Sequence, residues 1–198
     1  EMEHGNLSRH TMSEICSTDL VPTVLLLTEW GYTCANEMMN CFFLDSPPEE
    51  SLTKAYQILT DLGAIEQYKL PNEKQKRYRV TKHGDLIASL PTHPRFATAI
   101  IKAADMGELE LATAVTAAAL TEDVVAWKKE SNLGFNIRDL LNEGPNTYNG
   151  KQLINFASRL SVEAKSAVLN AMMSSERSSE VAERAGQALL FGFVDLIA

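Results

Sequence analysis

The chain has 198 residues with a formal net charge of -8, and 45% of its residues are hydrophobic. This length can bury one substantial core or two small ones, as in an ordinary globular protein. The acidic balance argues against a surface that binds nucleic acid over the whole molecule, and no apolar run reaches the roughly 20 residues that span a bilayer.

The first half of the chain mixes helical and strand patterns. Residues 47–50 are two prolines and two glutamates, which are typical of a helix start because proline suits the first turn and acids stabilise the positive end of the helix dipole. Gly63 ends this helix, and Pro91 lies beyond the end of the next one. The expected elements are an arm over residues 1–12, helices over 20–30, 35–44, 48–62 and 81–89, and strands over 65–69 and 77–81. Their order predicts a winged helix over residues 13–93.

The second half of the chain, residues 94–198, has only helical periodicity. Its high alanine content favours closely packed helices, and the loop-rich span 128–150 interrupts them. The serines near 174–179 indicate an exposed turn. Helical segments are expected over 96–103, 109–119, 137–141, 151–159, 162–173 and 179–194. The predicted fold class is therefore mainly α, a winged helix with a small two-stranded wing followed by an all-α helical bundle.

The cysteines indicate the cellular compartment, and the chain ends suggest how this sequence relates to a longer protein. The three cysteines are odd in number and too few for a disulfide framework, which favours a reducing, intracellular compartment. We expect the cytoplasm and leave an organelle open. The first residue is Glu1 and residues 186–198 are apolar, so we expect a segment of a longer protein, with chemistry that lies outside it.

The hairpin between the two expected strands is strongly basic. Residues 69–82 contain six basic side chains and a single acid, Glu73. Such a run is typical of a solvated hairpin, and the functional alternative is a wing that contacts phosphate or an acidic neighbouring domain. The four candidate residues for these contacts are Lys74, Lys76, Arg77 and Arg79.

Motifs for catalysis are missing from the sequence. There is no glycine-rich phosphate loop, no H-E-x-x-H and no G-x-S-x-G. His83 and His93 flank a predicted helix and are expected to cap it or to pack against it. We therefore expect no catalytic residue, no metal site and no cofactor within these 198 residues.

Several short patterns, taken together in order and spacing, resemble the segment that follows the motor domains in DEAH/RHA-type helicases. These patterns are an acid with two prolines and a second acid, then L-G-A-[LI], then T-x-x-G, then a leucine with two prolines. They stand here as Asp45, Pro47, Pro48 and Glu49; Leu62, Gly63, Ala64 and Ile65; Thr81 and Gly84; and Leu90, Pro91 and Pro94.

Further patterns resemble the bacterial HrpB type within that family. They are Trp30-Gly31, Thr92-His93-Pro94-Arg95 and the last dozen residues. The end departs from the HrpB pattern because Val194 and Leu196 replace a proline and an arginine, and Ser13 replaces a proline at the entry. The resemblance covers most of residues 13–125 and is loose over 126–178.

The resemblance implies a helicase-associated region, a winged helix followed by a ratchet-like bundle. In the family this region closes one side of the single-strand channel and couples motor movement to translocation. The implied partners are single-stranded RNA, with DNA as the alternative, and the motor domains and OB-fold of the same chain, without a membrane. ATP and magnesium belong to the motor domains, so the parent chain is expected to be an ATP-hydrolysing helicase. The strand contacts expected in this chain are Arg95, Lys102, Lys128 and Lys129.

Two other functions remain open at this point. A stand-alone winged-helix regulator would need basic side chains on a recognition helix, and the two candidate helices offer only Lys54 and Lys82. A purely structural interaction module is the third interpretation. For Arg95, a structural ion pair or a helix-end contact is the alternative to a phosphate contact.

Overall fold

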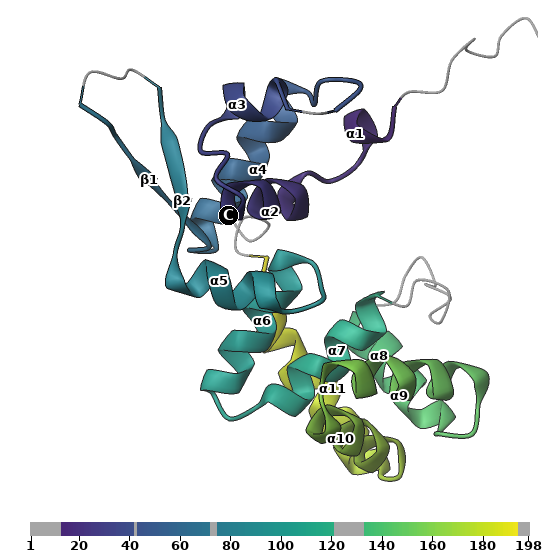
Figure 1. Cartoon of the computed structure of the whole chain (residues 1–198). Coiled ribbons are helices and arrows are strands. Elements are labelled where there is room, and N and C mark those ends of the chain that lie inside the picture. Colours follow the sequence, from purple (N-terminus) through teal and green to yellow (C-terminus); the bar gives the residue numbers. More distant parts are fainter. Residues whose placement is uncertain (1–12, 42, 72–74, 121–132, 194–198) are drawn as a thin grey trace, which may run out of the picture. The chain divides into compact units, whose positions relative to one another are not determined.

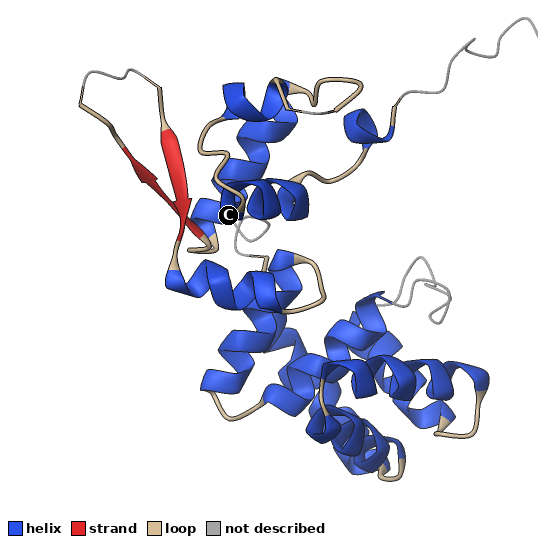
Figure 2. Cartoon of the chain, viewed as in Figure 1, coloured by secondary structure: helices blue, strands red, loops and turns tan. Residues whose placement is uncertain are grey.

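The computed structural model describes residues 13–41, 43–71, 75–120 and 133–193. The chain divides into two compact units, Glu1–Asp85 and Leu86–Ala198. The described part is mainly helical with one small antiparallel sheet, as the sequence predicted (Figure 2). The finer division into domains over 13–93 and 94–198 stays a prediction.

Among its described residues, the first unit holds four complete helices and the two strands (Figure 1). In chain order these are α1 (Glu14–Ser17), α2 (Val21–Glu29), α3 (Ala35–Met39), α4 (Glu49–Asp61), β1 (Ile65–Tyr68) and β2 (Arg77–Val80). The strands pair in register from Ile65 opposite Val80 to Tyr68 opposite Arg77. Helix α5 (Lys82–Ser89) follows and contains the boundary between the units. Only α1 was not expected from the sequence.

Helix α4 forms for the reasons that its sequence suggests. Pro48 is its N-cap residue and Glu49 and Glu50 occupy its first turn, where acids stabilise the helix dipole. The apolar stripe at helical spacing faces inward, since Leu52, Tyr56 and Leu59 are all at most 3% exposed. This burial makes α4 the central core helix of the first unit.

The turn after α4 and the start of α5 lock together through backbone contacts. Gly63 adopts a φ of 70°, which favours glycine, and turns the chain toward β1. The Thr81 hydroxyl donates to the Gly63 carbonyl at 2.6 Å and accepts from the Gly84 amide at 2.9 Å, so it caps α5. A Cβ on Gly84 would lie 2.0 Å from the Ala64 carbonyl oxygen. The two motifs L-G-A-I and T-x-x-G therefore pack directly against each other.

The second unit contains a bundle of helices. These are α6 (Pro94–Asp105), α7 (Leu109–Leu120), α8 (Leu133–Glu143), α9 (Tyr148–Leu160), α10 (Val162–Met172) and α11 (Ser175–Leu190). Its core alternates alanines with larger side chains such as Val115, Leu141 and Leu153, each fully buried. The small alanines let α7 pack against α6, α10 and α11 at once.

In the described part of this unit, three helices begin at least three residues before the predicted start. Helix α8 is longer than the expected 137–141 because Gly134 falls in its first turn, where the amides need no helical partner. Helix α9 begins at Tyr148 because the Thr147 hydroxyl accepts the Gly150 amide. The serines after residue 173 open α11 and do not form an exposed turn, since Ser174 caps the helix.

Candidate nucleic-acid interface

The basic residues of the hairpin differ in how far they are free to bind a ligand. The side chain of Arg77 is only 20% exposed, and its guanidinium donates to the Thr33 hydroxyl at 2.5 Å and to the Glu37 carboxylate at 3.0 Å. Tyr78 also fixes β2, because its backbone N–H donates a hydrogen bond to the Thr33 carbonyl and its ring stacks on Tyr56 with the centroids 4.2 Å apart. Arg77 therefore anchors the hairpin to α3 and to the loop before it.

Glu37 is held ionised at this anchor. Partial burial of its carboxyl raises the pKa, but hydrogen bonds from the Thr33 amide and hydroxyl and from Arg77 outweigh this effect. The pKa of Glu37 therefore lies below its ordinary value. The ion pair stabilises the folded hairpin most at neutral pH.

The outer part of the hairpin is more available. Arg79 is exposed and pairs across the strands with Glu66 at 2.7 Å, with its guanidinium over the ring of Tyr68. Lys76 is also exposed and makes no ion pair with any residue that the structure describes. Lys74 lies outside the described residues. Phosphate contacts by these residues stay a prediction.

In the second unit, Arg95 connects the start of α6 to the end of α11. Its guanidinium donates to the Gly192 carbonyl at 3.3 Å and lies 5.4 Å from the centre of the Phe193 ring. The His93 ring accepts the Arg95 amide, so it caps α6, the helix that follows it, and not the preceding helix that the sequence suggested. The structure thus places Arg95 in a contact between helix ends, which was the alternative to a phosphate contact. A contact of Arg95 with a nucleic-acid strand stays a prediction.

Lys102 lies seven residues after Arg95 on nearly the same face of α6. Its side chain is exposed and has no partner among the residues described here. An unpaired lysine can contact phosphate without first breaking an ion pair. Lys128 and Lys129 fall outside the described residues. Of the predicted strand contacts that the structure describes, Lys102 is the one without a partner among the described residues.

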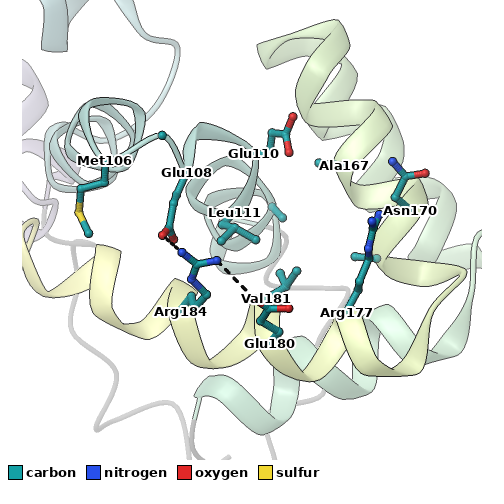
Figure 3. Close-up of a pocket in the computed structure, with 13 residues that line it drawn as sticks. Met106, Glu108, Glu110, Leu111, Ala167, Asn170, Arg177, Glu180, Val181 and Arg184 are labelled. Atoms are coloured by element: carbon teal, nitrogen blue, oxygen red, sulfur yellow. Dashed lines mark hydrogen bonds and ion pairs between the residues drawn. The ribbon is translucent and has the colours of Figure 1, made fainter.

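A pocket of about 370 Å³ lies in the second unit between α7, α10 and α11, and no sequence motif predicted it (Figure 3). Arg184 on α11 bridges one side of the pocket by pairing with Glu108 and with Glu180. The lining combines apolar and charged side chains: Met106, Gly107, Glu108, Glu110, Leu111, Ala114, Ala167, Asn170, Ala171, Arg177, Glu180, Val181 and Arg184.

The described part of the chain contains neither a cluster of metal-ligating side chains nor a membrane-spanning helix. Its His, Cys, Asp and Glu side chains form no group of three that could hold a metal ion. None of its helices has the length and apolar character to cross a membrane.

Comparison with known proteins points to one group of enzymes, although no family profile matches the chain. The chain is 27% identical over 107 residues to the probable ATP-dependent RNA helicase DHR2 of Saccharomyces cerevisiae, an alignment that covers 54% of this chain and 13% of that protein. It is 26% identical over 174 residues to the ATP-dependent RNA helicase HrpB of Escherichia coli, which covers 88% of this chain and 19% of HrpB. These relatives are ATP-dependent RNA helicases.

Solved structures give the same result for the fold. A crystal structure of the DExH-box NTPase HrpB of Escherichia coli matches 98% of this chain with a TM-score of 0.58 at 20% identity. A structure of the DEAH/RHA helicase HrpB matches 86% with a TM-score of 0.56 at 22% identity. The chain spans about a fifth or less of the length of these proteins. Its relatives and structural neighbours are helicases of the DEAH/RHA type, and it corresponds to one region of them.

Proposed function

We propose that the chain is the helicase-associated region of an ATP-dependent RNA helicase of the HrpB-like DEAH/RHA type. The observation that carries this proposal is the extent of the match to HrpB, which includes 98% of the chain in structure and 88% in sequence. A match over both compact units is what a conserved two-part accessory region would give.

In this proposal the first unit is a winged helix. Helices α2 and α4 pack against each other, and the β1–β2 hairpin follows α4 directly as the wing. The anchored Arg77 supports a wing that is held in one orientation, and the exposed Arg79 and Lys76 would face an acidic neighbour or phosphate. The second unit is the ratchet-like bundle.

The bundle would line one side of the path of single-stranded RNA. Exposed, unpaired Lys102 supports this role, because a phosphate contact holds the strand without reading its sequence. A net charge of -8 is compatible with it, since a channel needs only a local positive lining. By this contact the region would close the channel and couple motor movement to translocation.

The chemistry would come from elsewhere in the parent protein. ATP and magnesium need a phosphate loop, and the 198 residues contain none, so the chain by itself should not hydrolyse ATP. The motor domains and an OB-fold of the same polypeptide would be its direct partners, in a reducing intracellular compartment.

The test is the salt dependence of binding to single-stranded RNA. The chain is titrated into a fluorescently labelled oligouridylate at several salt concentrations, as wild type, Lys102→Glu and the control Lys151→Glu, which reverses an exposed lysine at the start of α9. Each lost phosphate contact lowers the slope of log affinity against log salt by about 0.7 for a single strand. We expect that loss in K102E and a wild-type slope in K151E. Equal slopes in all three proteins would show that the strand does not contact α6.

A further inference from the structure

The pocket between α7, α10 and α11 contains polar side chains that can still hydrogen-bond or ion-pair with a ligand. Glu110 on α7, Asn170 on α10 and Arg177 on α11 all line it. None of the three side chains makes a hydrogen bond or ion pair with another residue in the described ranges. Arg184 differs, because Glu108 and Glu180 already neutralise it. The pocket thus presents one free carboxylate, one free carboxamide and one free guanidinium.

The arrangement of these groups is visible in Figure 3. Glu110 and Asn170 come from the two helices that form opposite walls, and the Arg177 side chain extends from α11 toward Asn170. Between them the floor is apolar and includes Leu111, which belongs to α7, and Val181, which belongs to α11. A volume of about 370 Å³ lies within the range of roughly 300–1,000 Å³ that is typical of ligand pockets.

Charge and hydrogen-bonding chemistry restrict what could fill this pocket. Three carboxylates, from Glu108, Glu110 and Glu180, outnumber the two guanidinium groups, so a phosphate backbone would be repelled. A carboxamide offers both a donor and an acceptor, which matches the N–H and C=O groups of a peptide backbone. The free carboxylate attracts a basic side chain and the free guanidinium an acidic one.

We propose that this pocket binds an extended peptide segment of a partner protein. A basic side chain of the segment pairs with Glu110, an acidic one pairs with Arg177, and an aliphatic side chain between them packs on Leu111 and Val181. Asn170 bonds the backbone of the segment. The site goes beyond the proposed strand contact on α6, because it recruits a protein and not RNA.

The test uses selection from a random heptapeptide library displayed on phage, with the whole purified chain as bait. The wild type is compared with the charge-swapped variant Glu110→Arg/Arg177→Glu, which exchanges the two recognition groups. A matched control, Glu183→Arg/Lys151→Glu, exchanges the signs of two exposed residues outside the pocket. All four positions are exposed, so each protein should keep the wild-type circular dichroism spectrum.

We expect the wild type and the control to enrich peptides with a basic and an acidic residue on either side of an aliphatic one. The swapped variant should enrich peptides with that charge order reversed, and synthetic wild-type-selected peptides should bind it at least tenfold more weakly. No enrichment, or the same peptides from all three baits, would overturn the proposal. Binding of a labelled oligouridylate that is lost in the swapped variant but kept in the control would also overturn it, in favour of RNA.

Discussion

Substitution of Gly84 by alanine should unfold the junction between the turn after α4 and the start of α5. A Cβ at this position would lie 2.0 Å from the Ala64 oxygen and 2.7 Å from the Cγ1 atom of Val80, and Cβ contacts under 3.0 Å essentially never occur. Ala64 is fully buried and its oxygen accepts the Thr81 amide at 3.0 Å. Relief of the clash therefore requires the backbone to move by about 1 Å, which breaks that hydrogen bond.

The magnitude follows from three contributions. Overpacking costs about 1–3 kcal/mol, and loss of a buried hydrogen bond costs about 1 kcal/mol. Replacing glycine by alanine in a helix returns up to about 1 kcal/mol. The net expectation, with the full helical gain subtracted, is a loss of about 1–3 kcal/mol in the free energy of unfolding of the first unit.

Hydrogen exchange of the α4 amides, read by mass spectrometry, measures this loss of stability in the first unit alone. A local measurement is needed because a chain of two units need not unfold in one step. The expected loss corresponds to exchange that is roughly 5- to 150-fold faster. The matched control is Gly186→Ala in α11, where an added Cβ meets nothing within 4 Å and the helix should gain up to about 1 kcal/mol. Unchanged or slower α4 exchange in G84A would refute the assigned role of Gly84.

The remaining predictions concern single contacts. Because the folded-state pKa of Glu37 is lowered, its stabilising effect is complete above the unfolded-state pKa and is lost as the pH falls through the folded-state pKa. Glu37→Gln should therefore make the stability of the hairpin, measured by hydrogen exchange, depend less steeply on pH in the acid range. An equally steep dependence in E37Q would contradict this. Ser178→Ala removes the buried hydroxyl that donates to Asn142 at 2.8 Å and should cost about 1 kcal/mol in urea unfolding; no measurable change would show that the bond contributes nothing. Gly192→Ala places a Cβ 2.1 Å from the Arg95 carbonyl oxygen and should release the end of α11 from α6, seen as faster amide exchange at the start of α6. Exchange as slow as in the wild type would indicate that the backbone accommodates the methyl group.

Local signals account for what the sequence predicted well. Residues 47–50 and the apolar stripe from Leu52 to Leu59 are enough to place α4, because caps and helical spacing act within a few residues. The turn glycine Gly63 and the cap Thr81 similarly fix the ends of the hairpin. The same local rules failed at Ser174, because serine favours both exposed turns and helix N-caps.

Contacts between distant residues account for what the sequence could not predict. Arg77 and Glu37 are 40 positions apart, and Arg95 and Gly192 are 97 apart. The sequence therefore could not identify the partner of either arginine, although a helix-end contact was one of the interpretations for Arg95. The pocket likewise arises where α7 meets α10 and α11, and its free polar residues carry no common motif. The exposure of Lys102, by contrast, could be predicted from the sequence, because helical spacing indicates which face of α6 is exposed.

ATP hydrolysis by the whole parent protein, with and without single-stranded RNA, tests the helicase assignment most directly. The variants are Lys102→Glu and the control Lys151→Glu, both at exposed positions. We predict that RNA stimulates hydrolysis, that K102E needs several-fold more RNA for half-maximal stimulation with unchanged basal activity, and that K151E behaves as the wild type. A parent protein whose ATP hydrolysis does not respond to RNA, or that hydrolyses no ATP, would contradict the proposed function.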